Sequence, residues 1–143
     1  MNPTPSTMAP EMEYMLDTNT VSYFLKGEER VTERVVNTPV ESLCISSITK
    51  AELFFGLAGR PEATNLRRLV DEFLLRVEVL AWDSEVAEVY GRMRANLQNR
   101  GRQIKSHDML IAAHALTVGV VLVTSDSEFH WIEKLQTRDW RSP

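Results

Sequence analysis

Four acidic side chains occupy positions from which they could act together: Asp17, Glu52, Asp108 and Asp126. Carboxylates that pack together raise each other's pKa values, so such a cluster is tolerated when a divalent cation neutralises it. Oxygen ligands without a Cys or His box favour Mg²⁺ or Mn²⁺ over zinc. One or two such ions can activate a water molecule and stabilise a leaving oxygen, which suits phosphodiester hydrolysis.

Each acid also has a purely structural explanation when it is taken alone. Asp17 could cap the helix that follows it, and Asp108 could complement the dipole at the start of another helix. Asp126 could belong to a turn, and Glu52 could lie on a helix surface. These separate explanations leave the shared placement of the four acids unexplained, so we interpret them as one site.

The surrounding elements must bring these acids together. Short apolar runs typical of buried parallel strands occur at residues 14–16, 43–45, 77–80 and 118–123. Helical patterns lie between them at residues 20–25, 47–57, 63–76, 84–99 and 106–117, the last with Ser106 as its predicted N-cap. This alternation predicts an α/β fold with helices on both faces of a parallel sheet. Ligands bind beyond the carboxyl ends of such strands, where Asp17 and Asp126 stand.

Charged side chains are unevenly distributed along the chain. The formal net charge of −4 argues against a protein that binds nucleic acid through bulk positive charge. Residues 89–107 nevertheless carry five basic residues and no acid, namely Arg92, Arg94, Arg100, Arg102 and Lys105. This basic stretch is either a solvated helix face with its loop or a patch that contacts phosphates, and it leads directly to Asp108.

Other features narrow the class of protein. A single cysteine, Cys44, cannot form an internal disulfide or a Cys-based zinc site, which favours a reducing, cytoplasmic compartment. No apolar run approaches the roughly 18 residues of a membrane span. The three histidines, His107, His114 and His130, lack metal-ligand spacing and are expected to be surface or ordinary core residues. Residues 1–12, rich in Pro, Thr and Ser, predict a flexible leader, and residues 13–143 a single domain.

Four motifs resemble those of the PIN-domain ribonucleases and, more narrowly, of the VapC toxins of bacterial toxin–antitoxin pairs. They are Met-Leu-Asp-Thr-Asn-Thr at 15–20, Ile-Ser-Ser-Ile-Thr-Lys-Ala-Glu-Leu at 45–53, His-Asp-Met-Leu-Ile-Ala-Ala-His-Ala-Leu at 107–116 and Leu-Val-Thr-Ser-Asp-Ser-Glu-Phe at 122–129. The resemblance extends over residues 14–140, and the motifs keep the family's order. It implies a three-layer α/β/α sandwich around a central parallel sheet.

The resemblance also implies a metal-dependent endoribonuclease that uses Mg²⁺ or Mn²⁺ and cleaves structured RNA, often transfer RNA. The four acids match the family's catalytic and metal-binding acids in order. Supporting positions fall on Thr18, Asn19, Ser46 and Thr124, while Ser125 stands where the family often has Asn. With an RNA substrate, the basic stretch is expected to bind phosphates of the RNA backbone beside the acids.

Partners follow from the same resemblance. It implies a homodimer and a cognate VapB-type antitoxin whose C-terminal segment wraps the toxin, with operator DNA bound only through the complex and no contact with a membrane. Apolar residues that could face the antitoxin are Phe24, Phe54, Phe55 and Trp82. Burial in the core is the alternative explanation for each of them.

Other functions stay open at this point. A phosphoacceptor receiver domain also has an acidic pocket on a parallel sheet, but it needs a Lys at the end of its last strand. No Lys closes residues 118–124 here. A catalytically inactive binding module would retain the same acidic pocket, and a magnesium-dependent phosphatase would use the acids on another substrate.

Overall fold

A fully parallel five-stranded sheet forms the middle of the computed structural model, which describes residues 12–143. Most of the predicted leader, residues 1–11, lies outside the described residues. The strands of the sheet are β1 (Tyr14–Leu16), β2 (Leu43–Ser46), β3 (Glu78–Leu80), β4 (Val121–Val123) and β5 (Thr137–Arg138), and they lie in the order β3-β2-β1-β4-β5. The order reverses between β1 and β4, so the carboxyl ends of these two strands form the switch point where sheets of this kind bind ligands.

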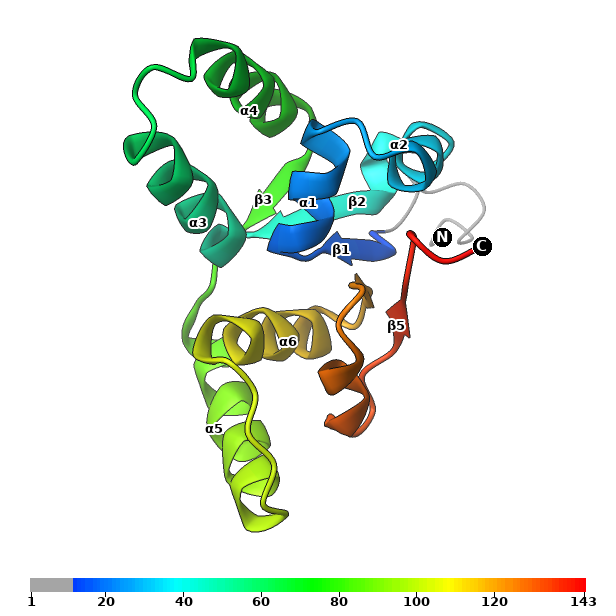
Figure 1. The fold of residues 1–143 in the computed structure, drawn as a ribbon. Coiled ribbons are helices and arrows are strands. Elements are labelled where there is room, and N and C mark those ends of the chain that lie inside the picture. Colours follow the sequence, from blue (N-terminus) through cyan, green and yellow to red (C-terminus); the bar gives the residue numbers. More distant parts are fainter. Residues whose placement is uncertain (1–11) are drawn as a thin grey trace, which may run out of the picture.

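Helices cover both faces of the sheet (Figure 1). One face packs against α1 (Thr18–Leu25), α2 (Glu29–Val36), α3 (Ser47–Ala58) and α4 (Thr64–Arg76). The other face packs against α5 (Ser84–Asn99) and α6 (Ser106–Val118). This arrangement confirms the expected three-layer α/β/α sandwich. No helix within residues 12–143 is long and apolar enough to cross a membrane.

Alternate strand residues build two separate cores. Met15 and Leu122 belong to the core beneath α5 and α6, whereas Leu16, Ile45 and Val123 belong to the core beneath α1–α4. All five side chains are fully buried. Since both faces of these strands need apolar side chains, the strands read as short apolar runs, and the first polar residues come where each strand ends.

The structure corrects two details of the segment around α6. Residues 118–123 are not one strand, because α6 extends to Val118 and β4 begins only at Val121. Between them Gly119 has φ +82°, a left-handed conformation that favours glycine and ends helices. The N-cap of α6 is Lys105 rather than Ser106, and it makes no side-chain capping hydrogen bond. Ser106 is the first helical residue.

Four short elements were not predicted. In the amphipathic helix α2, only Val31 and Val35 are buried. Strand β5 has two residues, and two 3₁₀ helices, η2 (Val40–Ser42) and η3 (Ser127–Trp131), precede β2 and follow β4. Helix α1 begins at Thr18, two residues earlier than predicted.

Candidate active site at the carboxyl edge of the sheet

Asp17 follows β1 directly and caps α1. Its Oδ1 accepts a hydrogen bond from the backbone N–H of Thr20 at 2.8 Å, and the residue is only 3% exposed. Burial raises the pKa of Asp17, and the charge of Asp126 adds to this, whereas hydrogen bonds with Thr124 and Thr20 oppose it. Helix capping was the structural explanation for this acid, and it holds without excluding a role in a joint site.

Glu52 reaches the same edge from the middle of α3. Thr18 Oγ1 donates a hydrogen bond to Glu52 Oε1 at 2.6 Å, and the same hydroxyl lies 3.2 Å from Thr49 Oγ1. The start of α3 is fixed by its N-cap, Ser46, whose Oγ accepts from the backbone N–H of Ile48 at 3.1 Å. The carboxylate is therefore oriented by a hydroxyl from the first residue of α1.

Asp108 lies in the first turn of α6. His107 Nε2 is 3.5 Å from Asp108 Oδ1 and 3.7 Å from Glu52 Oε2, so the imidazole bridges two of the acids. Burial raises the pKa of Asp108, His107 opposes this rise, and the charges of Asp126, Asp17 and Glu52 add to it. The bridging role of His107 was missed from the sequence, where its place directly before Asp108 was the only signal.

Asp126 follows β4 and caps η3. Its Oδ1 accepts from the backbone N–H of Glu128 at 2.9 Å, and its own backbone N–H donates to Thr124 Oγ1 at 3.1 Å. This local role matches the turn explanation, yet its charge also acts on Asp17 and Asp108. Acids from four distant segments thus meet at this edge, where their charges act on Asp17 and Asp108.

The chemistry of these donors fits a hard divalent cation. The site offers carboxylate and hydroxyl oxygens, which Mg²⁺ and Mn²⁺ prefer. The lone thiol is absent from it, because Cys44 is buried in the core, where burial raises the pKa of the thiol to about 12. Among residues 12–143, no three His, Cys, Asp or Glu side chains are already arranged to hold an ion. The fit therefore rests on donor chemistry and mutual repulsion rather than on a formed coordination sphere.

The four supporting residues lie in three different surroundings. Thr18 and Thr124 contact the acids, as described above. Ser46 is fully buried, and its Oγ lies 2.7 Å from Nδ1 of His114, whose pKa burial lowers. This hydrogen bond joins the β2–α3 junction to α6 and so links the segments that carry two of the acids. Asn19 is exposed at the start of α1.

All five residues of the basic stretch are exposed, but they lie in different surroundings. Arg94 and Arg102 line a cavity of about 500 Å³ that extends to the first turn of α6. The Arg102 guanidinium also stacks on the ring of Trp131, 4.7 Å from its centroid. Arg100 donates to the carbonyl of Trp131 at 2.7 Å. Only part of the basic stretch thus borders the helix that carries Asp108.

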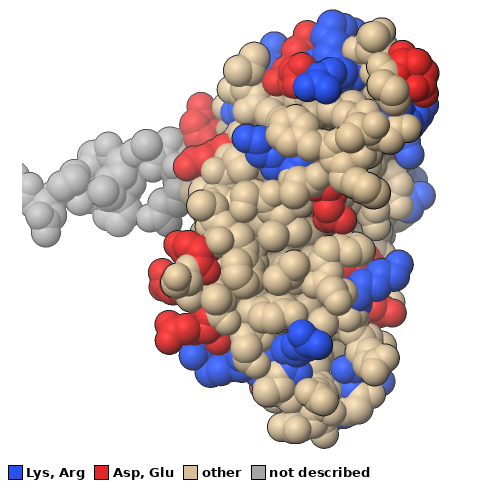
Figure 2. Space-filling view, turned by 90° about the vertical axis from the view of Figure 1, so that its left-hand side faces the viewer, with Lys and Arg blue, Asp and Glu red and all other residues tan. Residues whose placement is uncertain are grey.

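Two of the four apolar residues considered as an antitoxin surface are exposed. Phe54 and Phe55 on α3 are 39% and 82% exposed. Phe24 packs against a phenylalanine of α4, and the half-buried Trp82 donates its indole N–H to the carbonyl of Leu110 at 2.9 Å. On the side of α3 and α4, charged groups gather towards two ends and leave a broad area with few charges between them (Figure 2).

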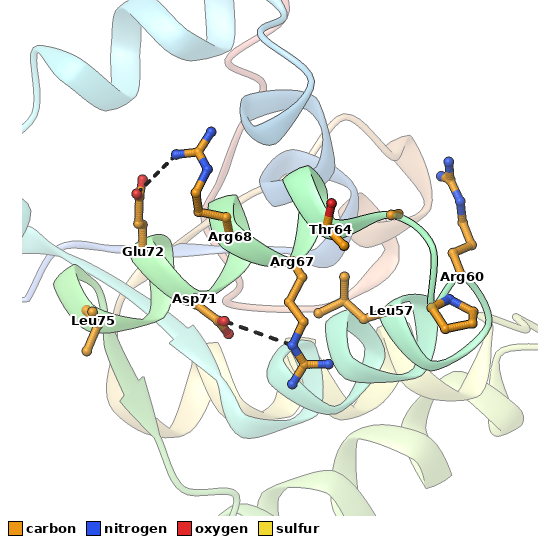
Figure 3. Close-up of a pocket in the computed structure, with 10 residues that line it drawn as sticks. Leu57, Arg60, Thr64, Arg67, Arg68, Asp71, Glu72 and Leu75 are labelled. Carbon is orange, nitrogen blue, oxygen red and sulfur yellow. Dashed lines mark hydrogen bonds and ion pairs between the residues drawn. The ribbon is translucent and has the colours of Figure 1, made fainter.

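A separate cavity of about 350 Å³ lies between the end of α3 and α4 (Figure 3). Four of its charged side chains pair along α4, where Arg67 lies 4.0 Å from Asp71 and Arg68 lies 3.2 Å from Glu72. None of the four site acids lines it. We therefore place the candidate active site at the strand ends and not in this cavity.

Known proteins share both the sequence and the fold of this chain. The PIN domain family matches residues 14–135. A tRNA(fMet)-specific endonuclease VapC from Salmonella typhimurium is 36% identical over 131 residues, which cover 90% of this chain and 98% of that protein. A ribonuclease VapC1 from Haemophilus influenzae is 37% identical over 132 residues, with the same coverage. The crystal structure of DNA-bound VapBC from Salmonella typhimurium aligns with a TM-score of 0.84 and 36% identity, over 90% of this chain and 98% of that chain.

Proposed function

This chain belongs to the PIN-domain family, and we propose that it is a VapC-type toxin, an endoribonuclease that cleaves structured RNA such as transfer RNA. One structural observation supports this most directly: the charges of Asp126, Asp17 and Glu52 all act on Asp108 at the switch point of the sheet. The names of the relatives, which are ribonucleases and a tRNA(fMet)-specific endonuclease, support the proposed substrate class.

Asp17, Glu52 and Asp108 would hold Mg²⁺ or Mn²⁺, with Asp126 assisting. When bound, such a cation would lower the pKa of a water molecule and stabilise negative charge on the leaving oxygen. The chain's own contribution is orientation: Thr18 fixes Glu52, and hydrogen bonds from Thr20 and Thr124 fix Asp17. Burial is the main cause of the raised pKa values of Asp17 and Asp108, and the charges of neighbouring acids add to the rise.

Hydrolysis at this site is expected to leave 5′-phosphate and 3′-hydroxyl ends. Water attacks the scissile phosphate in line, and the 3′ oxygen of the preceding nucleotide leaves. Arg94 and Arg102, which line the cavity beside α6, are proposed to contact the RNA backbone. Arg92, Arg100 and Lys105 belong to the same proposed surface.

A cognate VapB-type antitoxin is the proposed partner, and operator DNA would be bound through that complex. The likeness to a DNA-bound VapBC structure supports this proposal. Phe54 and Phe55 offer exposed apolar area for such a partner. We further propose a homodimer and a cytoplasmic location, the latter because the only cysteine is unpaired and buried.

Cleavage of total RNA by purified protein in Mg²⁺ tests the proposed activity. Asp108→Asn should lose at least about 100-fold in rate, the usual contribution of a positioned catalytic group. Asp83→Asn is the matched control, because Asp83 also stands at a helix start but caps α5 outside the site. Undiminished cleavage by Asp108→Asn would overturn the assignment.

Other outcomes would favour the alternatives. A wild-type protein that binds Mn²⁺ and leaves every RNA intact would indicate a catalytically inactive binding module. Hydrolysis of a phosphomonoester such as p-nitrophenyl phosphate without RNA cleavage would indicate a phosphatase. Stable phosphorylation by a small phosphodonor such as acetyl phosphate would indicate a receiver-like domain.

A further inference from the structure

A polar cavity of about 430 Å³ adjoins the acids on the side of Asp126. Three segments that lie far apart in the sequence meet around it: Arg34 of α2, the turn that follows β4, and the chain from β5 to the C-terminus. Thr124 and Asp126 belong both to the wall of this cavity and to the candidate active site. A ligand in the cavity would therefore lie beside Asp126 and Thr124.

Two guanidinium groups in the cavity wall are available to an anion. Arg34 donates to the carbonyl of Ser142 at 3.1 Å, and Arg138 donates to the carbonyl of Thr137 at 2.9 Å. Neither forms an ion pair with a carboxylate anywhere in residues 12–143. Within the described residues, their guanidinium groups are therefore not engaged in ion pairs, although the carboxylates of Asp126 and Asp139 line the same cavity.

The remaining wall offers hydrogen-bonding groups of both kinds. Ser127 and Thr137 contribute hydroxyls, and Asp139 Oδ1 accepts from Ser125 Oγ at 2.7 Å and from the backbone N–H of Arg141 at 3.0 Å. Cations together with hydroxyls and a carboxylate suit a ligand that carries both anionic oxygens and hydrogen-bond donors. A ribonucleotide carries both, in its phosphate and in its 2′-hydroxyl and base. The volume also falls within the range of roughly 300–1,000 Å³ that is usual for small-ligand sites.

We propose that this cavity is the subsite for the nucleotide next to the scissile bond, where Arg34 and Arg138 hold the adjoining phosphate. This inference rests on the proposed ribonuclease function and adds substrate contacts outside the basic stretch. It adds Arg34 and Arg138, which share a cavity wall with Asp126, to Arg94 and Arg102, which line a separate cavity beside α6.

Steady-state cleavage of tRNA by the full chain, measured over a range of salt concentrations, tests the subsite. Arg34→Gln/Arg138→Gln should raise KM roughly tenfold or more and affect kcat much less, because charge-assisted hydrogen bonds to the substrate are lost. The slope of log KM against log salt concentration should fall by about 0.7 if both arginines contact the same phosphate, and by about 1.4 if they contact two different phosphates. Compared with the glutamine variant, Arg34→Lys/Arg138→Lys should restore part of the slope, because lysine keeps the positive charge but lacks the planar guanidinium that binds a phosphate through two hydrogen bonds.

Arg67→Gln/Arg68→Gln is the matched control, because it removes the same charge from exposed positions of α4 that are paired within their own helix. If both double variants change KM and the salt slope equally while the wild type cleaves, the subsite is wrong and the proposed function stands. A wild type that cleaves no RNA overturns both. Should the double variant unfold, Arg138→Gln alone alters an exposed side chain of β5 and should still lower the slope by about 0.7.

Discussion

Asp17 carries a structural role and a chemical role, and two substitutions separate them. Asp17→Asn retains an oxygen that can accept from the backbone N–H of Thr20, whereas Asp17→Ala removes it. Asn and Asp are about equally good N-caps. Both substitutions remove a carboxylate whose pKa is raised by burial and by Asp126. We expect both proteins to lose cleavage and only the alanine variant to lose the cap.

The expected difference in stability follows from the capping hydrogen bond. Loss of an N-cap costs about 1 kcal/mol. For a chain of 143 residues the unfolding entropy is about 0.3 kcal/mol/K, so Asp17→Ala should melt about 3 °C below Asp17→Asn. Without metal, Asp17→Asn should be at least as stable as the wild type, because it no longer buries a charge against its neighbours. Thermal unfolding in EDTA and cleavage in Mg²⁺ measure the two roles.

Asp83 supplies the control for both measurements. Its Oδ1 accepts from the backbone N–H of Val86 at 3.2 Å, and it caps α5 from an exposed position. Asp83→Ala should therefore lose a similar amount of stability and retain cleavage. Wild-type cleavage by Asp17→Asn would refute the chemical role, and an Asp17→Asn protein no more stable than Asp17→Ala would refute the capping argument.

Four further predictions concern the acids and the groups around them. Thr18→Val should slow cleavage by roughly tenfold through loss of the 2.6 Å hydrogen bond to Glu52, whereas Thr18→Ser should not; equal rates would show that this hydroxyl is dispensable. Because burial lowers the pKa of His114 below 6.5, the wild type should lose stability relative to His114→Gln as pH falls below about 6.5, where only the unfolded chain takes up the proton. Urea unfolding at about pH 7.5 and about pH 5.5 measures this, and parallel pH profiles would contradict it. Mn²⁺ at 100 times its Kd should stabilise the wild type by about 2.7 kcal/mol, or roughly 9 °C, and an equal shift in Asp108→Asn would contradict the proposed ligand set. Without metal, Asp108→Asn should be more stable than the wild type at neutral pH, because the raised pKa of Asp108 means that its charged form destabilises the folded state. This difference in stability should vanish as pH falls towards 3.8, because the carboxyl group becomes protonated in the folded protein at a higher pH than in the unfolded chain.

The strands and most helices could be predicted because burial on both faces leaves a direct mark on the sequence. The apolar runs before Asp17 and Ser46 correspond to β1 and β2, and the spaced apolar residues of 84–99 correspond to α5. Helix α2 was not predicted because only two valines form its buried face. Strand β5 was not predicted because its two partly exposed residues form no recognisable pattern. Residues 118–123 were wrongly predicted to be one strand, because β-branched residues lie on both sides of Gly119 and form a continuous apolar run with it.

Three of the four acids could be proposed from their positions, because Asp17 and Asp126 follow strands and Asp108 opens a helix, whereas Glu52 lies in the middle of α3. The partners of the acids could not be predicted, since hydrogen bonds such as that of Thr18 with Glu52 join residues 34 positions apart. His107 and Arg34 were missed for the same reason: one bridges acids from two helices, and the other lies on the helix that was not predicted. Contacts of this kind depend on how the elements pack, and no local spacing encodes them.

The chemistry of the cleaved ends tests most directly whether the four acids form one hydrolytic site that works with a divalent cation. Transfer RNA cut by the wild-type protein in Mg²⁺ should carry 5′-phosphate and 3′-hydroxyl ends, and EDTA should abolish cleavage. Fragments that end in a 2′,3′-cyclic phosphate and form equally well in EDTA would contradict the account. They would mean that the RNA's own 2′-hydroxyl attacks the phosphate without any cation held by Asp17, Glu52 and Asp108.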